Sequence, residues 1–488
     1  MNSITTKADI GLIGLAVMGQ NLVLNMNDHG YRVCVFNRTI STVDHFLNNE
    51  ARNTNIIGAK SLQQFIDNLA IPRKIFLLVK AGRPVDDFIE KLTPFLSVGD
   101  IIIDGGNSEY NDSTRRCRHL AEKQILFVGS GISGGEEGAR HGPSLMPGGN
   151  VEAWKHIQPI FQSICAKAEN NEPCCDWVGL EGAGHFVKMV HNGIEYGDMQ
   201  LICEAYHLMR DLLDIGNEEM SNIFQQWNKE ELESFLIEIT SVIIKFQTEN
   251  GKYLINDICD TAGQKGTGKW TAINALDFGV PVTLIAESVF ARSLSAFKQV
   301  RVEASKRFGN RNTKFYFTGN KHEFLNDLKL ALYASKIISY TQGFMMMKTA
   351  SDQYKWELNL GKIALMWRGG CIIRSRFLQN IKQAYEKDET LFVLLFDEFF
   401  QGEILRCEAN WRKVISSAVM HGLPTPAFSS ALAFYDGLRT ERLPANLLQA
   451  QRDLFGAHQY QLTSDPNVYL HCNWTGNGGN TAASTYQA

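Results

Sequence analysis

The sequence predicts an α/β protein in which a Rossmann-like, doubly wound sheet is followed by a large all-α domain and a C-terminal tail. The first third of the chain alternates short apolar runs with amphipathic stretches, a pattern typical of a parallel sheet covered by helices on both faces. Long helical periods dominate from residue 181 onward. With 488 residues the chain is long enough for two or three domains, and we expect their boundaries at residues 1–180, 181–440 and 441–488.

Five apolar runs are expected to form the strands of the sheet, and they lie at residues 10–13, 32–36, 74–79, 101–104 and 125–129. The crossover helices between parallel strands, which are nearly always right-handed, are expected at residues 20–29, 61–69, 84–92 and 113–123. Further helices are expected at residues 202–213, 229–249, 281–308 and 323–348. The end of the chain, residues 473–488, is rich in Gly, Thr and Asn, so we expect it to be disordered or ordered only against another surface.

The charges nearly cancel, because 48 Lys and Arg stand against 52 Asp and Glu. This balance argues against a protein that binds nucleic acid or a membrane surface, since such proteins usually carry a basic excess. No apolar run reaches the roughly 18 residues of a membrane-spanning helix, and no signal peptide is recognised. The ten cysteines include no Cys-x-x-Cys pair, and the adjacent Cys174 and Cys175 are expected to be ordinary thiols. We therefore expect a cytoplasmic protein.

A dinucleotide-binding fingerprint, Gly-x-Gly-x-x-Gly with Ala in the second glycine position, follows the first expected strand. It consists of Gly14, Leu15, Ala16, Val17, Met18 and Gly19. The first glycine allows a tight turn, the small second residue lets the backbone approach a pyrophosphate, and the last glycine lets helix and strand pack closely. Free N–H groups at the start of the helix then face the phosphates. These residues are expected to bind the cofactor.

The end of the second expected strand indicates which dinucleotide is bound. An enzyme that prefers NAD usually has Asp or Glu here to hold the ribose 2′-hydroxyl. This chain instead has Asn37, Arg38 and Thr39. The Arg38 guanidinium can pair with a 2′-phosphate, which a carboxylate would repel. The sequence therefore predicts NADP as the cofactor.

Two further strand ends fit a crevice for the nicotinamide, because ligands of open α/β sheets bind beyond the carboxyl ends of the strands. Val79, Lys80 and Ala81 lie at the end of the strand that begins at residue 74. Asn107 lies just beyond the strand that begins at residue 101, where its side chain can both donate and accept hydrogen bonds.

A glycine-rich loop is expected over residues 129–139. Its backbone can come close to a small polar ligand, because glycine adds no side chain. Ser133 in this loop is a candidate to hydrogen-bond a carboxylate of that ligand.

The segment 182–210 is expected to be a helix that carries catalytic side chains on one face. The polar residues at the spacing i, i+3, i+4, i+7 and i+8 are Lys188, His191, Asn192, Glu195 and Tyr196. A solvated face usually repeats Glu and Lys, whereas each of these side chains has a different bonding role. A Lys and a Glu two turns apart can act as base and acid on a small substrate, provided that burial or a nearby positive charge lowers the pKa of the lysine. We find no Asp/Glu cluster with metal-ligand spacing, so no metal is expected.

Taken together, these motifs resemble those of the 6-phosphogluconate dehydrogenase family, the decarboxylating, NADP-dependent enzymes of the pentose phosphate pathway and of gluconate utilization. The resemblance runs from residue 10 to residue 458 and on into the tail. Its motifs lie at residues 14–21, 37–39, 132–149, 188–196, 264–271, 292 and 449–458. In the tail, Leu454, Gln459 and Gln461 depart from the family pattern without replacing Arg452 or His458.

The resemblance implies a role for each matching residue. Those that bind NADP would be Gly14–Gly19, Asn37–Thr39, Val79–Ala81 and Asn107. Those that hold the sugar acid would be Asn107, Ser133, Gly134, Gly135, His191, Asn192 and Tyr196. Lys265 and Arg292 would bind its phosphate. Arg452 and His458 would come from the partner subunit, so the active enzyme would be a homodimer whose tail threads into its neighbour.

The reaction that the resemblance implies is the oxidative decarboxylation of 6-phospho-D-gluconate to D-ribulose 5-phosphate and carbon dioxide, with reduction of NADP to NADPH. Lys188 would be the general base and Glu195 the general acid. No metal would be needed, because a lysine ammonium can polarise the substrate carbonyl as a divalent ion does in other oxidative decarboxylases.

Three other interpretations stay open at this point. Another β-hydroxyacid dehydrogenase, of the 3-hydroxyisobutyrate type, would share the glycine fingerprint, the Ser-Gly-Gly segment and the catalytic lysine. Enzymes of that type resemble this chain but are much shorter and lack the set formed by Lys265, Arg292, Arg452 and His458. An NAD-preferring variant is disfavoured by Arg38, and a catalytically inactive NADP-binding scaffold or redox sensor is disfavoured because both Lys188 and Glu195 are present.

Overall fold

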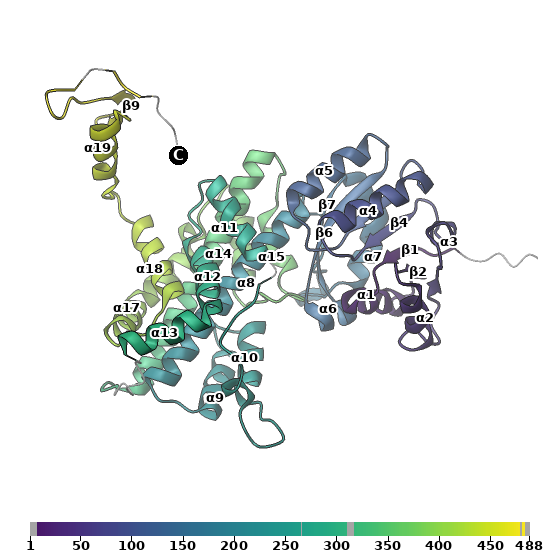
Figure 1. The fold of residues 1–488 in the computed structure, drawn as a ribbon, viewed down its shortest axis with the longest axis horizontal. Helices are drawn as coiled ribbons and strands as arrows, with labels where there is room; N and C mark the ends of the chain where they lie inside the picture. Colours follow the sequence, from purple (N-terminus) through teal and green to yellow (C-terminus); the bar gives the residue numbers. More distant parts are fainter. Residues whose placement is uncertain (1–6, 265, 310–316, 479–480, 484–488) are drawn as a thin grey trace, which may run out of the picture. The chain divides into compact units, whose positions relative to one another are not determined.

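The computed structural model describes residues 7–264, 266–309, 317–478 and 481–483. The chain divides into two compact units, Met1–Ala431 and Leu432–Ala488. Within the first unit, a sheet region formed by the N-terminal part of the chain is followed by a region built from helices (Figure 1). This order is the one that the sequence predicts, so the expected fold class is confirmed.

Among the described residues, seven strands form one sheet in the order β3-β2-β1-β4-β5-β6-β7. Neighbouring strands are parallel, except that β7 is antiparallel to β6. The strands are β1 (Ile10–Ile13), β2 (Val33–Phe36), β3 (Ile57–Gly58), β4 (Lys74–Leu77), β5 (Ile101–Asp104), β6 (Leu126–Ser133) and β7 (Ser144–Gly149). All five expected strands are confirmed. Two strands were not expected: β3, which is only two residues long, and β7, whose Pro and paired Gly are unusual in strands.

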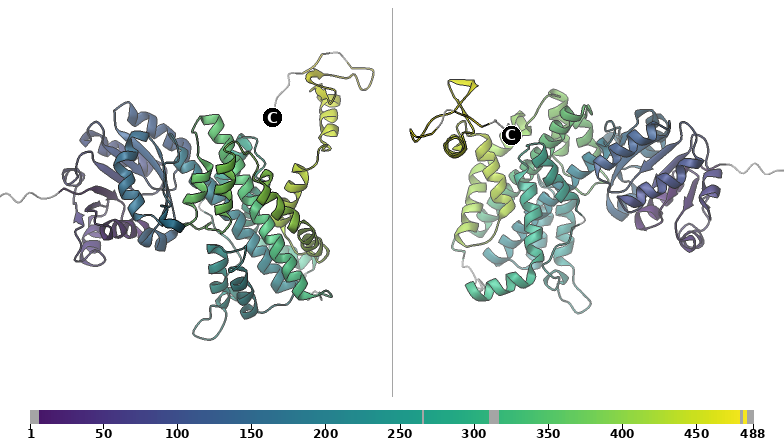
Figure 2. Two further views of the ribbon diagram at one scale, coloured as in Figure 1. Left: turned by 180° about the vertical axis from the view of Figure 1, so that it is seen from behind. Right: turned by 45° about the horizontal axis from the view of Figure 1, so that its top comes forward.

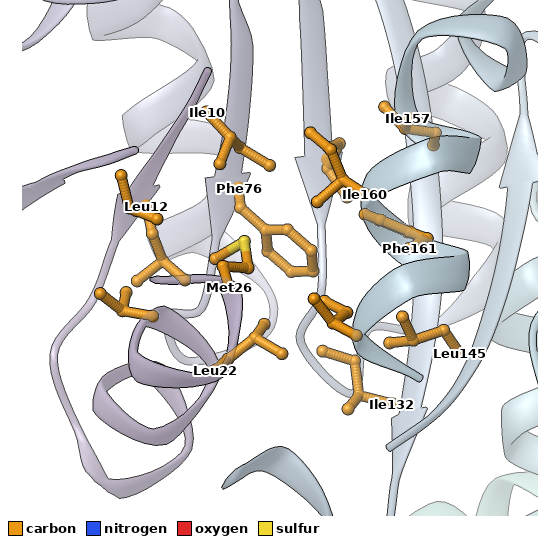
Figure 3. Packing of buried hydrophobic residues seen from close by; sticks show 14 of the residues in the cluster. Ile10, Leu12, Leu22, Met26, Phe76, Ile132, Leu145, Ile157, Ile160 and Phe161 are labelled. Carbon is orange, nitrogen blue, oxygen red and sulfur yellow. The ribbon is translucent and has the colours of Figure 1, made fainter. Parts of the chain in front are cut away.

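Helices cover both faces of the sheet, as expected for a doubly wound fold. They are α1 (Val17–Asp28), α2 (Ile40–Asn48), α3 (Leu62–Asp67), α4 (Arg83–Leu92), α5 (Tyr110–Ala121), α6 (Gly135–His141) and α7 (Trp154–Ile164). Ile101 and Ile103 of β5 face the core shared with α1 and α7, whereas Ile102 faces the core shared with α4 and α5. Figure 3 shows the first core, in which strand residues meet Leu22, Met26, Ile160 and Phe161.

The strand order creates a switch point between β1 and β4. From β1 the chain adds β2 and β3 on one side, and then returns to add β4, β5 and β6 on the other side. The register pairs Ile13 with both Phe36 and Leu77, and pairs Leu77 with Asp104. The residues that follow β1, β2, β4 and β5 therefore meet at one edge of the sheet, which is where ligands bind in open α/β folds.

The second region of this unit consists of helices, of which α8, α12, α15 and α17 contact the long helix α14. The helices are α8 (Ala183–His207), α9 (Asn217–Trp227), α10 (Phe235–Lys245), α11 (Thr267–Asp277), α12 (Thr283–Ala296), α13 (Lys298–Phe308), α14 (Lys321–Tyr354), α15 (Leu360–Met366), α16 (Leu378–Lys387), α17 (Glu398–Met420) and α18 (Pro426–Leu438), the last of which crosses the unit boundary. Figure 2 shows these teal and green helices beside the purple and blue sheet region from two further sides. None of the helices within the described ranges is long and apolar enough to cross a bilayer.

Three expectations about local structure need correction. The segment 229–249 was expected to be one helix, but only Phe235–Lys245 is helical. The segment 281–308 was expected to be one helix, but it forms α12 and α13 with a break at Phe297. The segment 129–139 was expected to be a glycine-rich loop, but β6 continues through Ser133 and α6 begins at Gly135. The glycines of this segment were mistaken for loop signals because their role is in packing between elements, which is visible only in three dimensions.

Close packing explains those glycines. Helix α8 lies directly against β6 and β7. A Cβ atom on Gly131 would come within 2.4 Å of the Cβ atom of Lys188, and one on Gly184 would come within 2.2 Å of the carbonyl oxygen of Gly129. Since real Cβ atoms do not approach other atoms this closely, glycine is required on both sides of the interface.

Residues 473–488, whose composition predicted disorder, are described only in part, and regular structure precedes them in the C-terminal unit. This unit contains α19 (Ala445–Gly456) and an antiparallel pair of strands, β8 (Tyr460–Leu462) and β9 (Asp465–Leu470). The buried carboxylate of Asp453 joins these elements, because it accepts hydrogen bonds from the backbone N–H groups of Gln459 and Cys472 and from the side chains of His471 and Trp474. Asp453 therefore organises this second unit from within.

The glycine interface generates a stability prediction. We expect Gly184→Ala to lower the free energy of unfolding by about 1–3 kcal/mol, because its Cβ atom would meet three backbone atoms that cannot move aside. The matched control is Gly402→Ala on α17, where a Cβ atom meets nothing within 4 Å and alanine raises helix propensity. Urea unfolding followed by circular dichroism measures both changes, and equal effects in the two variants would contradict the packing argument.

Candidate active site

The fingerprint residues form a tight turn between β1 and α1. Gly14 has φ = 110°, and a Cβ atom on it would lie 2.2 Å from the carbonyl oxygen of Leu78. A Cβ atom on Gly19 would lie 1.9 Å from the carbonyl oxygen of Gly14. Helix α1 begins at Val17 with no side-chain cap on its N-terminus, so its first N–H groups are open to an anionic ligand. The turn therefore has the features that the fingerprint predicts.

The residues after β2 lie beside this turn. The Asn37 side chain accepts a hydrogen bond from the Leu15 N–H at 3.2 Å and donates one to the Thr39 carbonyl at 3.2 Å. Asn37 thus connects the first and second strand ends. Arg38 and Thr39 are exposed at the same edge, where they are accessible to a ligand that extends from the turn.

The residues after β4 and β5 also lie at this edge, and the chain after β4 approaches the chain after β5. A Cβ atom on Gly106 would lie 3.2 Å from the carbonyl oxygen of Val79. Asn107 is exposed at the end of β5. Lys80 is exposed and Ala81 is partly buried at the end of β4. The structure therefore brings together the predicted cofactor residues from all four strand ends.

A buried charged network, which sequence reasoning missed, holds these two strand ends in place. The carboxylate of Asp104 accepts hydrogen bonds from the Gly106 N–H at 3.0 Å, the Ser108 hydroxyl at 2.6 Å and the Arg116 guanidinium at 3.2 Å. Arg116 also donates to the Gly82 carbonyl at 3.1 Å and to both carboxylate oxygens of Asp86. One buried guanidinium thus ties the chain after β4 to the chain after β5.

The polar face of α8 is buried rather than solvated. Lys188 is 7% exposed, His191 is 0% exposed and Asn192 is 8% exposed. The Lys188 Nζ atom lies 3.2 Å from His191 Nδ1, which in turn lies 2.9 Å from Asn192 Oδ1 and 3.8 Å from Glu195 Oε2. The helical spacing therefore predicted correctly that these side chains lie together. Their burial was not predicted, because it depends on β6, α11 and α14, which pack against α8.

Burial shifts the protonation of the two candidate catalytic groups toward their neutral forms. Desolvation lowers the pKa of Lys188, and the Glu195 carboxylate opposes part of this shift. Desolvation also raises the pKa of Glu195, against the opposite effect of Lys188 and Arg292. The pKa of His191 lies well below its usual range, first because it is buried and second because Lys188 is close. A neutral amine and a neutral carboxyl group are the forms that act as a base and an acid.

The end of β6 supplies Ser133, Gly134 and Gly135. The Ser133 hydroxyl lies 3.1 Å from His191 Nε2. Gly134 and Gly135 have φ values of 112° and 62°, and a Cβ atom on Gly134 would lie 2.7 Å from the carbonyl oxygen of Gly370. Glycine is therefore required at the turn that follows Ser133.

Cys371 is a site residue that the sequence analysis missed. Its sulfur lies 2.9 Å from His191 Nε2, and the residue is buried. The adjacent Gly369 and Gly370 were a sequence signal for close approach that could have drawn attention to it, and Gly370 does pack against Gly142 and Ser144 of the sheet region.

The predicted phosphate-binding residues are described in part. The Arg292 guanidinium of α12 lies 3.6 Å above the ring of Tyr196, and it donates to the Gly263 carbonyl at 3.4 Å. Lys265 lies outside the described residues. Arg452 and His458 belong to the second unit, in which Arg452 donates to the Gln449 side chain at 2.8 Å. Within the described ranges, no group of three or more His, Cys, Asp or Glu side chains is placed to hold a metal ion.

Comparison with known proteins identifies the family. Residues 9–179 match the family model described as the NAD binding domain of 6-phosphogluconate dehydrogenase, and residues 184–474 match that of the 6-phosphogluconate dehydrogenase C-terminal domain. The chain is 63% identical to 6-phosphogluconate dehydrogenase, decarboxylating, from Homo sapiens, over 99% of this chain and all of the relative. It is 64% identical to the enzyme of the same name from Rattus norvegicus, over 99% of this chain and all of that relative.

A solved structure of Plasmodium falciparum 6-phosphogluconate dehydrogenase has the same fold. It matches with a TM-score of 0.93 at 43% sequence identity, and the match covers 96% of this chain and all of the other. The agreement therefore extends through both regions of the first unit and is not confined to the dinucleotide-binding sheet. The chain belongs to the 6-phosphogluconate dehydrogenase family.

Proposed function

We propose that this protein catalyses the oxidative decarboxylation of 6-phospho-D-gluconate to D-ribulose 5-phosphate and carbon dioxide, with reduction of NADP to NADPH. The observation that carries the proposal is the buried face of α8, where Lys188 and Glu195 flank His191. The Plasmodium falciparum relative was solved in its apo form, with NADP+ and with 6-phosphogluconate, which supports this choice of ligands. The direct test is to mix the protein with both substrates and measure NADPH and carbon dioxide together.

The residues at the strand ends fit NADP. The open N-terminus of α1 and the close-packed glycines of the turn leave room for a pyrophosphate, and Arg38 supplies a cation for the 2′-phosphate. The residues that would hold the cofactor are Gly14–Gly19, Asn37–Thr39, Val79–Ala81 and Asn107. When bound, NADP accepts a hydride from the substrate.

The sugar acid would lie between the end of β6 and the buried face of α8. Ser133, Gly134 and Gly135 would bind it from one side, and His191, Asn192 and Tyr196 would bind it from the other. Asn107 would contact it near the cofactor, and Lys265 and Arg292 would bind its phosphate. Arg452 of the partner subunit and His458 of the partner subunit would complete the phosphate site.

Lys188 would act twice on the same substrate oxygen. As a neutral amine it takes the proton of the 3-hydroxyl while the hydride leaves C3, and the product is a 3-keto acid. As an ammonium it then donates a hydrogen bond to the 3-keto oxygen, where electrons from the breaking bond between C1 and C2 collect as carbon dioxide leaves. Glu195 would complete the reaction by protonating the carbon that lost carbon dioxide. No step in this scheme needs a metal ion.

The assembly that we propose is a cytoplasmic homodimer with shared sites. Phe290, Leu294 and Phe297 follow the helical spacing i, i+4 and i+7 and are 66%, 61% and 60% exposed. Monomeric proteins seldom expose such an apolar face, so it supports contact with a second copy. We also propose that the functional division follows residues 1–180, 181–440 and 441–488, with the last segment reaching the partner.

Neither a dehydrogenase of the 3-hydroxyisobutyrate type nor an inactive NADP-binding scaffold is favoured. An enzyme of the 3-hydroxyisobutyrate type would not be expected to match named 6-phosphogluconate dehydrogenases over 99% of the chain. An inactive NADP-binding scaffold would have no need to bury a lysine and a glutamate side by side, because burying charged groups costs stability.

Replacement of the proposed base should stop turnover while binding survives. We expect Lys188→Met and Lys188→Arg to lower kcat by about 10²–10⁴-fold, because neither side chain can accept the hydroxyl proton at neutral pH. Calorimetry should still detect binding of 6-phosphogluconate. The control is Lys348→Met on α14, whose ammonium pairs with Asp352 away from the site and whose loss should leave kcat unchanged. Near-normal turnover in Lys188→Met would show that Lys188 is not the general base.

The pH dependence of the wild-type enzyme should report the same group. Lys188 must be neutral to accept a proton, so kcat/KM should fall as the pH drops through its pKa. Because burial lowers that pKa, this acidic limb should lie below the ordinary range of a lysine. A limb at the ordinary lysine pKa would contradict the burial argument.

Arg38 should set the choice of cofactor. We expect Arg38→Ala to lower kcat/KM with NADP by about 10–100-fold, because a charge-assisted contact with the 2′-phosphate is lost, and to leave kcat/KM with NAD unchanged. Arg52→Ala is the control, because Arg52 is an exposed cation just beyond the far end of α2. Equal losses with the two cofactors would show that Arg38 does not contact the 2′-phosphate.

Complementation should reveal a shared site. In a heterodimer of Lys188→Met and Arg452→Ala chains, one site carries both defects and the other carries neither. Random pairing in an equal mixture should therefore restore about one quarter of wild-type activity at low substrate concentration. The control pairs Lys188→Met with Glu195→Gln, which both lie on α8, so no intact site can form. If the first mixture showed no recovery of activity, that result would contradict the shared site.

A further inference from the structure

His191 lies at the centre of a hydrogen-bonded chain that ends at Lys188. On one side of the ring, Nε2 lies 2.9 Å from the Cys371 sulfur and 3.1 Å from the Ser133 hydroxyl. On the other side, Nδ1 lies 2.9 Å from Asn192 Oδ1 and 3.2 Å from Lys188 Nζ. Which ring nitrogen carries the proton therefore determines what Lys188 meets.

The neighbours of the ring identify that nitrogen. Asn192 Oδ1 can only accept a hydrogen bond, so Nδ1 must donate to it. The Glu195 carboxyl oxygen, 3.8 Å from Nδ1, favours a proton at the same place. Nε2 then carries no proton, and its lone pair needs a neighbouring group that donates a hydrogen bond. A contact of 2.9 Å between nitrogen and sulfur is too short to lack a shared proton, and burial raises the pKa of Cys371 to about 12, so the proton is on the sulfur.

We propose that the Cys371 thiol donates its proton to His191 Nε2 and, by holding the ring in the Nδ1–H tautomer, keeps Lys188 as a neutral amine. A protonated Nδ1, whose hydrogen is directed at Asn192 Oδ1, cannot accept from an ammonium, so the charged form of Lys188 has no acceptor in this ring. The opposite tautomer would offer Lys188 an acceptor and stabilise its charged form. Cys371 is thus a positioning residue for the base. This inference rests on the proposed function, in which Lys188 removes the hydroxyl proton.

Other charged groups near Lys188 do not replace this effect. Glu195 from the same helix favours the ammonium only while it is ionised, and Cys371 would do so only as a thiolate, which its raised pKa opposes. Arg292 of α12 and Asp198 of α8 act on Glu195 rather than on the amine. Ser133 can also donate to Nε2, so loss of the thiol should weaken the preference for one tautomer without abolishing it.

The first test is the pH dependence of kcat/KM for 6-phosphogluconate. We expect Cys371→Ala to move the acidic limb to higher pH by about half a unit, because Lys188 gains an acceptor for its charged form. Cys371→Ser keeps a donor at this position and should restore the wild-type profile. Cys407→Ala is the matched control, because it removes a buried thiol of α17 whose charged neighbours are Arg406, Glu403, Glu231 and Lys329, and it should alter stability without moving the limb.

The second test needs no turnover. In protein with nitrogen-15-labelled histidine, the two ring shifts of His191, assigned with a His191→Asn variant, report the tautomer. We expect a protonated Nδ1 in wild type and Cys371→Ser, and a mixture in Cys371→Ala. Protonated Nε2 in wild type, or an unchanged pH profile in Cys371→Ala, would overturn the inference. Failure of wild type to oxidise 6-phosphogluconate would instead overturn the proposed function, since the nitrogen shifts would still report the tautomer.

Discussion

The contact of α8 with β6 and β7 is the constraint on which the site depends. Glycines on the strands and at the start of the helix let the two backbones approach so closely that any side chain between them would clash. This approach places Lys188, in the second turn of the helix, directly against Gly131 of β6. The edge proposed to bind the cofactor and the helix proposed to carry catalysis belong to different regions of the chain, and this interface joins them.

Burial then determines the chemistry of that helix. The polar face of α8 is enclosed by β6, α11, α14 and the segment that carries Cys371, so water cannot stabilise charge there. Desolvation disfavours the ammonium of Lys188 and the carboxylate of Glu195 together, which is what a neutral base and a neutral acid require. One turn further along, the buried Lys336 ammonium of α14 donates to the Asp198 carboxylate of α8 at 2.5 Å, and this ion pair joins the two helices.

Buried ions also hold the segments that we propose to contact the ligands. Arg116 joins the segments after β4 and β5 through Asp86 and Asp104, and so fixes the edge at which the nicotinamide would lie. In the separate C-terminal unit, Asp453 gathers four donors around the end of α19, next to Arg452. In each case a single enclosed charge with several hydrogen bonds replaces the hydrophobic packing that loops cannot provide.

The sequence alone determined the fold class, the fingerprint and the catalytic face, because these depend on local spacing: period two or 3.6 for the elements, and fixed offsets for Gly14–Gly19 and Lys188–Tyr196. It predicted a loop for the glycine-rich segment 129–139, which is strand and helix in the structure. It also could not identify Cys371 as a partner of His191, or Arg116 and Asp104 as partners of each other. Those roles arise from contacts between residues far apart in the chain, such as the 180 positions that separate His191 from Cys371. Only the tertiary structure decided them, because burial and hydrogen bonding depend on which distant elements close over a side chain.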